Sequence, residues 1–108
     1  MLDIIKKKKN MRFIIKGPFK VNVYSLMRKI SYHFQGKNEE KSELIFVRPE
    51  RGYPRFHLYL KTEGKNLIFN LHLDQKRPIY KGATAHAGEY DGKVVEEEVK
   101  RIKQMLNI

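Results

Sequence analysis

Two neighbouring segments of this chain alternate apolar and polar residues, and they constrain the fold more than any other feature. In residues 55–61 every second side chain is Phe or Leu, and the same holds in residues 67–73. A period of two residues is typical of a β-strand that buries one face. Gly64-Lys65 lies between the two segments and is suited to a tight turn. The sequence therefore predicts a β-hairpin with a two-residue or four-residue loop.

Burial of the Leu and Phe side chains on one face determines the register of this hairpin. A shift by one residue would turn the whole apolar set toward solvent. Both loop lengths place Leu58 opposite Leu71, on the face that is buried. On the other face the predicted pairs are Arg55 with Asp74, His57 with His72, and Tyr59 with Asn70.

Two more strands are predicted outside the hairpin. Residues 11–16 are rich in β-forming side chains and end at Gly17-Pro18. Residues 44–47 form a short apolar run, as buried strands do. The preceding residues, 37–42, are polar and are predicted to be a loop.

Two helices are predicted from apolar residues at helical spacing. The first has Asn22 as its N-cap, an apolar stripe over residues 23–34, and Gly36 as its C-terminal stop. The last has a buried stripe between Val95 and Leu106 and an i,i+4 ion pair between Glu97 and Arg101. We interpret this last helix as structural.

The element order is thus β-α-β-β-β-α, which predicts an α+β fold in which two helices pack on a mainly antiparallel sheet. With 108 residues, the chain is expected to be one two-layer domain, residues 1–108, whose first ten residues are a frayed basic segment. No apolar run approaches the ~20 residues that span a bilayer, so we expect a cytoplasmic protein without a membrane partner. The absence of cysteine excludes thiolate metal sites and cysteine nucleophiles. The oligomeric state stays open.

The net charge of +11 is unevenly distributed along the chain. Residues 1–36 carry nine Lys and Arg against one acidic residue, whereas residues 37–54 and 91–108 each balance four against four. Such an excess favours an anionic partner, which could be nucleic acid, a phosphorylated ligand or an acidic protein surface. The alternative is the Lys- and Glu-rich solvated surface that proteins of thermophiles carry.

Binding of nucleic acid or another polyanion is the leading interpretation. Tyr59 on the polar face of the hairpin could stack bases while basic side chains contact phosphates. The alternative is that this tyrosine packs against the loop that follows the hairpin. The residues assigned to the interface are Arg28, Lys29, Arg55, Tyr59, Lys76, Arg77 and Lys81.

The alternative function is that of a metal-dependent hydrolase or nuclease. Two histidines across a hairpin can reach one ion, and a third lies in residues 75–90, a segment without periodicity that is longer than most loops. A divalent metal held there would activate water for hydrolysis of a phosphate ester. The candidate ligands are His57, His72, Asp74 and His86. The alternative, which we favour over metal binding, is that the hairpin histidines are surface residues of an amphipathic sheet, and no other cofactor is expected.

Two resemblances extend this interpretation. In the order helix, three strands, helix, residues 22–108 are similar in topology to double-stranded-RNA-binding domains. That family places lysines at the start of its last helix, where this chain has Glu96, Glu97 and Glu98, so the departure speaks against membership. Over residues 70–98, NLHLDQKRPIYKGATAHAGEYDGKVVEEE, the chain resembles small prokaryotic proteins of archaeal type whose activity is unassigned. That resemblance implies a stand-alone domain and supplies no site residues.

Overall fold

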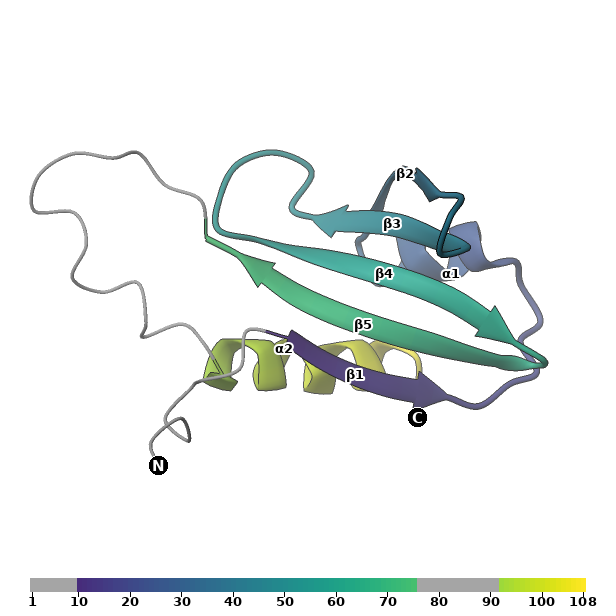
Figure 1. The fold of residues 1–108 in the computed structure, drawn as a ribbon. Helices are drawn as coiled ribbons and strands as arrows, with labels where there is room; N and C mark the ends of the chain where they lie inside the picture. The colour runs from purple at the N-terminus through teal and green to yellow at the C-terminus, as the bar shows by residue number, and fades with distance from the viewer. Residues whose placement is uncertain (1–9, 76–91) are drawn as a thin grey trace, which may run out of the picture.

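The structure, a computed structural model, describes residues 10–75 and 92–108. In this part of the chain, five antiparallel strands form one sheet in the order β1-β5-β4-β3-β2 (Figure 1). The strands are β1 (Asn10–Ile15), β2 (His33–Asn38), β3 (Glu43–Arg48), β4 (Arg55–Glu63) and β5 (Asn66–Asp74), and the helices are α1 (Val23–Lys29) and α2 (Gly92–Met105). The predicted α+β class, with two helices on an antiparallel sheet, is confirmed.

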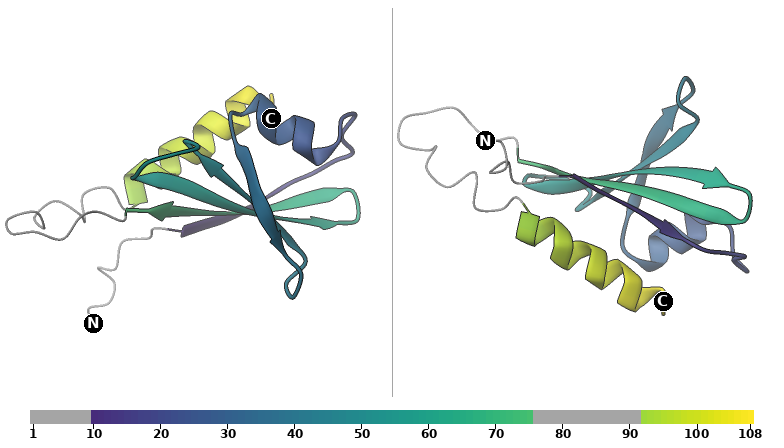
Figure 2. Two further views of the ribbon diagram at one scale, coloured as in Figure 1. Left: turned by 90° about the horizontal axis from the view of Figure 1, so that it is seen from above. Right: turned by 60° about the horizontal axis from the view of Figure 1, so that its bottom comes forward.

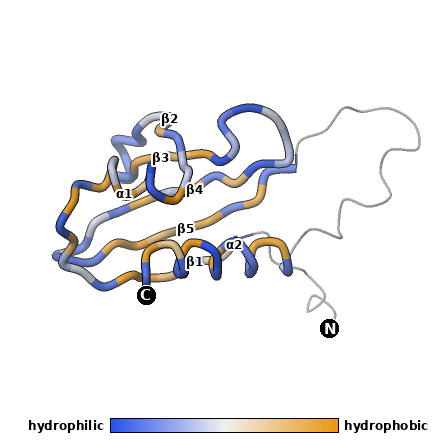
Figure 3. The backbone as a smooth tube through the Cα atoms, turned by 180° about the vertical axis from the view of Figure 1, so that it is seen from behind, coloured by the Kyte–Doolittle hydropathy of each residue, from blue (hydrophilic) through white to orange (hydrophobic). Residues whose placement is uncertain are grey.

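Both helices cover the same face of a strongly twisted sheet, as the two turned views show (Figure 2). The core lies between the layers and contains the alternating Leu and Phe side chains of β4 and β5. Its other main members are Ile15, Leu26, Met27, Ile30, Phe46, Val95 and Ile102. Hydrophobic positions follow the strands and α2, whereas the turn between β4 and β5 is hydrophilic (Figure 3). Neither helix in the described ranges is long and apolar enough to cross a membrane.

The register of the β4–β5 hairpin is the one that the sequence predicts. Leu58 lies opposite Leu71, and Glu63 lies opposite Asn66, so that the loop consists of Gly64 and Lys65 alone. The polar pairs of the other face are also confirmed: Arg55 with Asp74, His57 with His72, and Tyr59 with Asn70. The hairpin therefore sorts its side chains into a core face and a polar face.

Helix α1 begins as predicted but ends earlier. The Asn22 side chain accepts a hydrogen bond from the Ser25 N–H at 2.9 Å, which is the expected N-cap. The helix stops at Lys29 rather than near Gly36, because Ser31 takes a left-handed conformation with a φ of 71°. Two hydrogen bonds of a Schellman motif then end the helix. The Ser31 N–H donates to the Arg28 carbonyl, and the Tyr32 N–H donates to the Met27 carbonyl.

The chain after α1 forms a strand that the sequence did not predict. Residues 33–38 are β2 and pair with β3, so the element order is β-α-β-β-β-β-α instead of β-α-β-β-β-α. Phe34, predicted on the apolar stripe of the helix, lies instead on β2 and is 51% exposed. Its ring lies 5.3 Å from the Tyr24 ring and 5.5 Å from the Phe46 ring.

We expect Ser31→Gly to stabilise the protein by roughly 0.5–1 kcal/mol. A left-handed conformation costs a residue with a Cβ about 1–2 kcal/mol, and the greater freedom of glycine in the unfolded chain offsets part of that gain. Chemical denaturation followed by circular dichroism measures the change. Ser25→Gly, inside α1, is the matched control and should destabilise by about 0.5 kcal/mol. Equal signs for the two variants would contradict this explanation of the helix end.

A buried carboxylate joins α2 to the rest of the fold. Glu98 is 4% exposed and receives hydrogen bonds from three side chains, which together with it we call the Glu98 cluster. The Tyr32 hydroxyl donates to it at 2.7 Å, and Arg48 and Arg101 each donate two N–H groups at 2.9–3.0 Å. Arg101 also donates to the Ile30 carbonyl at 2.7 Å. One carboxylate therefore ties α2 to β3 and to the end of α1.

The electrostatics of the Glu98 cluster follow from its geometry. Burial by itself would raise the pKa of Glu98, but hydrogen bonds from Arg101, Arg48 and Tyr32 outweigh it and lower the pKa below its usual range. Burial raises the pKa of Tyr32, and the charge and hydrogen bond of Glu98 raise it further. The tyrosine therefore stays protonated and remains a donor. The predicted Glu97–Arg101 pair is replaced by an i,i+3 pair between Glu98 and Arg101.

The connection between β1 and α1 passes very close to the β4–β5 turn. The Gly17 N–H donates to the Asn66 side-chain oxygen at 3.2 Å. A Cβ at position 17 would lie only 1.9 Å from the Lys65 carbonyl oxygen, so the backbones can approach this closely only because residue 17 is glycine.

Candidate nucleic-acid interface

The sheet has a second face that neither helix covers (Figure 2). Since side chains alternate along a strand, the pairing register shows which residues are neighbours there. One row across the sheet consists of Asn10, His72, His57, Val47 and His33. The next row contains Arg12, Asn70, Tyr59 and Ile45. We call this surface the open face; it combines aromatic, amide, imidazole and basic groups.

A pocket with a cavity volume of about 230 Å³ lies on the open face, where β1, β5 and β4 adjoin. Among the described residues, its lining consists of Asn10, Tyr59, Asn70 and His72. Two carboxamides, an imidazole and a phenol supply both hydrogen-bond donors and acceptors. The pocket is therefore suited to a flat, polar group that presents both kinds of partner.

Tyr59 and His57 stand side by side on β4, with their rings nearly parallel. The ring centroids are 6.1 Å apart and the planes differ by 16°. Burial raises the pKa of Tyr59, and the negative charges of Glu43 and Asp74 raise it further, so the hydroxyl stays protonated and can donate. Together the two rings form a short aromatic strip beside the pocket.

The two hairpin histidines have different environments. The Nδ1 atom of His72 is hydrogen-bonded to the side-chain oxygen of Asn10, which can only accept, so Nδ1 carries the proton. When this imidazole is neutral, its Nε2 is an acceptor. Burial lowers the pKa of His57, and the charge of Arg55 lowers it further, although Asp74 acts in the opposite direction. His57 is therefore neutral at pH 7.

Part of the predicted metal site is brought together by the hairpin. His57 and His72 are cross-strand partners, and the Nδ1 atom of His57 lies 3.5 Å from the Oδ2 atom of Asp74. His86 lies outside the described residues. Within residues 10–75 and 92–108, no three His, Asp or Glu side chains are grouped to hold a metal ion. The four-ligand metal site stays a prediction.

The structure separates the predicted nucleic-acid-binding residues into two places. Arg55 and Tyr59 lie on the open face, and the guanidinium of Arg55 packs 4.5 Å from the centre of the Tyr53 ring. Arg28 and Lys29 lie on α1, on the opposite side of the sheet, where Arg28 donates to the Ser25 hydroxyl at 3.1 Å. Lys76, Arg77 and Lys81 are outside the described part of the chain.

Sequence reasoning missed four polar residues of the open face, one of which is Lys61, two residues after Tyr59 on β4. Asn70 could have been included, because the predicted hairpin register places it opposite Tyr59. Asn10 and Arg12 enter the face only because β1 pairs with β5, which lies about 60 residues further along the chain. No local pattern in the sequence indicates that pairing.

Comparison with known proteins adds no family to this description. No protein-family model matches the chain, and no curated protein is significantly similar to it. The resemblance of residues 70–98 to small archaeal proteins therefore stays a prediction. A function for this chain has to be inferred from the geometry of the open face.

Proposed function

We propose that the protein binds single-stranded nucleic acid on the open face. The observation that carries this proposal is the pair of parallel rings, His57 and Tyr59, beside the pocket lined by Asn10, Asn70 and His72. Sheet faces that display aromatic side chains bind unpaired bases by stacking, which contributes about 1–3 kcal/mol per base. Such a ligand would place the protein in the cytoplasm.

The pocket supports the proposal because its groups match those on the edge of a base. A base stacked on Tyr59 would direct its edge toward the carboxamide of Asn70 and the imidazole of His72. Carboxamides can donate and accept at once, as the edges of adenine, cytosine, guanine and uracil require. These side chains are partly exposed, so a ligand can reach them.

Basic side chains on the open face supply the contacts to phosphate. Arg12 is the cross-strand neighbour of Asn70, and Lys61 follows Tyr59 on the same side of β4. Arg55 lies at the end of β4 that carries His57. Asp74 lies beside Arg55 and Glu43 lies near Tyr59 on the β3 side, so we expect phosphate to bind toward Arg12 on β1. The net charge of +11 would favour encounter with any polyanion.

The test is Tyr59→Ala, with binding of fluorescein-labelled oligo(U) and oligo(dT) measured by fluorescence anisotropy. Loss of one stacking contact should weaken binding by roughly 5- to 150-fold, and affinity for the unaltered protein should fall steeply between about 50 and 200 mM salt. Tyr24→Ala is the matched control, because Tyr24 is 41% exposed on α1, on the other side of the sheet. Equal affinities for the two variants, or no binding at low salt, would overturn the proposal.

A further inference from the structure

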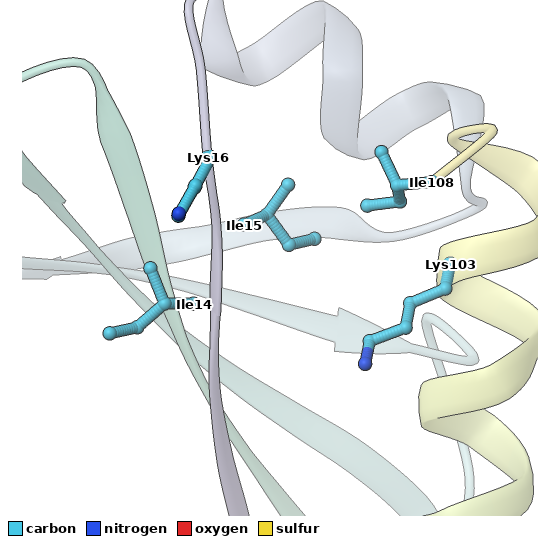
Figure 4. A pocket seen from close by; sticks show the side chains of 5 residues that line it. All are labelled: Ile14, Ile15, Lys16, Lys103 and Ile108. Carbon is cyan, nitrogen blue, oxygen red and sulfur yellow. The ribbon is translucent and has the colours of Figure 1, made fainter.

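A second hollow lies along the outer edge of β1. Its volume is about 370 Å³, and it is lined by Ile14, Ile15, Lys16, Lys103 and Ile108. Ile14 and Lys16 are on one side of the strand, whereas Ile15 is on the other side with Lys103 and Ile108 (Figure 4). Because consecutive residues of a strand point to opposite faces, a hollow lined from both sides must follow the strand edge. We call it the β1 groove.

The outer edge of β1 is a surface to which a further strand can be added. Among the strands that the structure describes, β1 pairs with β5 alone, so its other edge presents unpaired N–H and C=O groups. Large apolar side chains are exposed beside it: Ile14 is 49% exposed and Ile108 is 58% exposed. Unpaired main chain next to exposed isoleucine is what an extended peptide requires for strand addition.

The opposite edge of the sheet is less suited to this purpose. The pairing of β2 with β3 is interrupted by a bulge between Phe34 and Gly36. The exposed Lys37 follows on the same strand. Bulges and lysines on an edge strand both discourage pairing with another chain. In the described part of β1, residues 10–15 keep an uninterrupted register with β5.

The charges of the β1 groove define the ligand. Lys16 and Lys103 both line it, and no acidic side chain does so in the described part of the chain. The ammonium group of Lys103 lies 5.6 Å from the centre of the Phe13 ring. This cation–π contact favours a Lys103 side chain that lies over the core-facing side of β1. Each side of β1 thus offers one ammonium group beside isoleucine, which complements an extended segment that carries both an acidic and an apolar residue on each of its two faces.

We propose that the β1 groove binds an extended acidic peptide segment of a partner protein by strand addition. The main chain of the peptide pairs with β1. On one side of the added strand an apolar side chain packs against Ile14 and a carboxylate lies near Lys16, and on the other side the corresponding groups meet Ile108 and Lys103. A second copy of this chain is a poorer occupant. Pairing β1 with β1 would bring the basic residues Arg12 and Lys16 of the two copies together, and like charges across a strand pair are destabilising.

The test uses a fluorescein-labelled peptide of about seven residues in which two Glu alternate with two Val, so that each face carries both kinds, and which is long enough to extend along β1. We expect saturable binding by anisotropy, and at least about tenfold weaker binding of the matched Lys and Val peptide. Methylation of alternate peptide nitrogens should abolish binding, because strand addition needs those N–H groups. Tyr59→Ala should leave peptide binding unchanged, which separates this result from nucleic-acid binding.

Charge reversal locates the site on the protein. Lys103→Glu should weaken binding of the acidic peptide by about tenfold or more. Lys93→Glu changes the charge equally at the other end of α2 and should leave binding unchanged, with circular dichroism confirming that both variants fold. No saturable binding, equal binding of acidic and basic peptides, or insensitivity to N-methylation or to Lys103→Glu would overturn the proposal. A concentration-dependent dimer that Ile14→Glu abolishes would also overturn it, because the groove would then belong to a second copy.

Discussion

Replacing Glu98 with alanine is expected to lower the free energy of unfolding by about 3 kcal/mol. Removing one partner from a buried ion pair typically costs about 3–5 kcal/mol, because the remaining charge is left uncompensated. Here two arginines and the Tyr32 hydroxyl lose their acceptor at once. The side chains of Arg48 and Arg101 are 32% and 27% exposed, so they recover some hydration. We therefore expect the lower end of that range.

Urea denaturation followed by circular dichroism measures this change, with Glu97→Ala as the matched control. Glu97 is the preceding residue of α2 and is exposed, so its loss should change the free energy of unfolding by less than about 0.5 kcal/mol. Similar effects of the two substitutions would show that the Glu98 cluster does not hold α2 in place.

The dependence of this effect on pH follows from the lowered pKa of Glu98. A carboxyl with a lower pKa in the folded state stabilises the fold fully above its unfolded pKa, near 4.3, and loses this contribution as the pH falls through the folded value. The stability difference between the unaltered protein and Glu98→Ala should therefore be largest at neutral pH and shrink below about pH 4. A difference that grows on acidification would contradict the assigned direction.

Gly17→Ala is expected to destabilise the protein by about 1–3 kcal/mol, the usual effect of forcing extra atoms into a packed site. The new Cβ would lie 1.9 Å from the Lys65 carbonyl oxygen and 3.0 Å from its carbonyl carbon. Both are backbone atoms, so no change of rotamer relieves the clash. Either the end of β1 or the β4–β5 turn must move, and the hydrogen bond from Gly17 to Asn66 is then weakened.

Gly36→Ala provides the comparison for this substitution. A Cβ at position 36 meets no atom within 4 Å, and the φ of Gly36 is not in the left-handed region. We expect the midpoint of urea denaturation to change little for Gly36→Ala and to fall clearly for Gly17→Ala. Equal midpoints would contradict the close approach of the two backbones.

The parts of the fold that were predicted correctly are those that short-range patterns determine. The hairpin register follows from period-two burial around Gly64 and Lys65, and the start of α1 follows from Asn22. The end of α1 was missed because its apolar spacing continues to Phe34. Ser31 takes a left-handed conformation, and the next residue, Tyr32, is held by a hydrogen bond from its hydroxyl to Glu98, 66 positions away.

Glu98 was missed for a different reason. It belongs to a run of three glutamates, and such runs usually face solvent. Its position in the sequence nevertheless indicates burial, because Glu98 follows Val95 by three residues and precedes Ile102 by four. That spacing places it on the buried stripe of α2. An acidic residue at a core position indicates a buried cationic partner, although the sequence does not show which arginines supply it.

About half of the candidate site could be predicted from the sequence. Tyr59, His57 and His72 follow from the hairpin pattern, because register alone places them on one face. Asn10 and Arg12 depend on the long-range pairing of β1 with β5. Arg28 and Lys29 were correctly placed on the first helix, but the sequence did not show that this helix covers the face of the sheet opposite to Tyr59.

The most direct test of nucleic-acid binding on the open face is an NMR titration of the ¹⁵N-labelled protein with oligo(U). The proposal predicts that the largest amide shifts fall on β1, β4 and β5, at Asn10, Tyr59, Asn70 and His72, and that α1 is little affected. Shifts that concentrate instead on Arg28 and Lys29 would place binding on the helix side of the sheet and contradict the proposal.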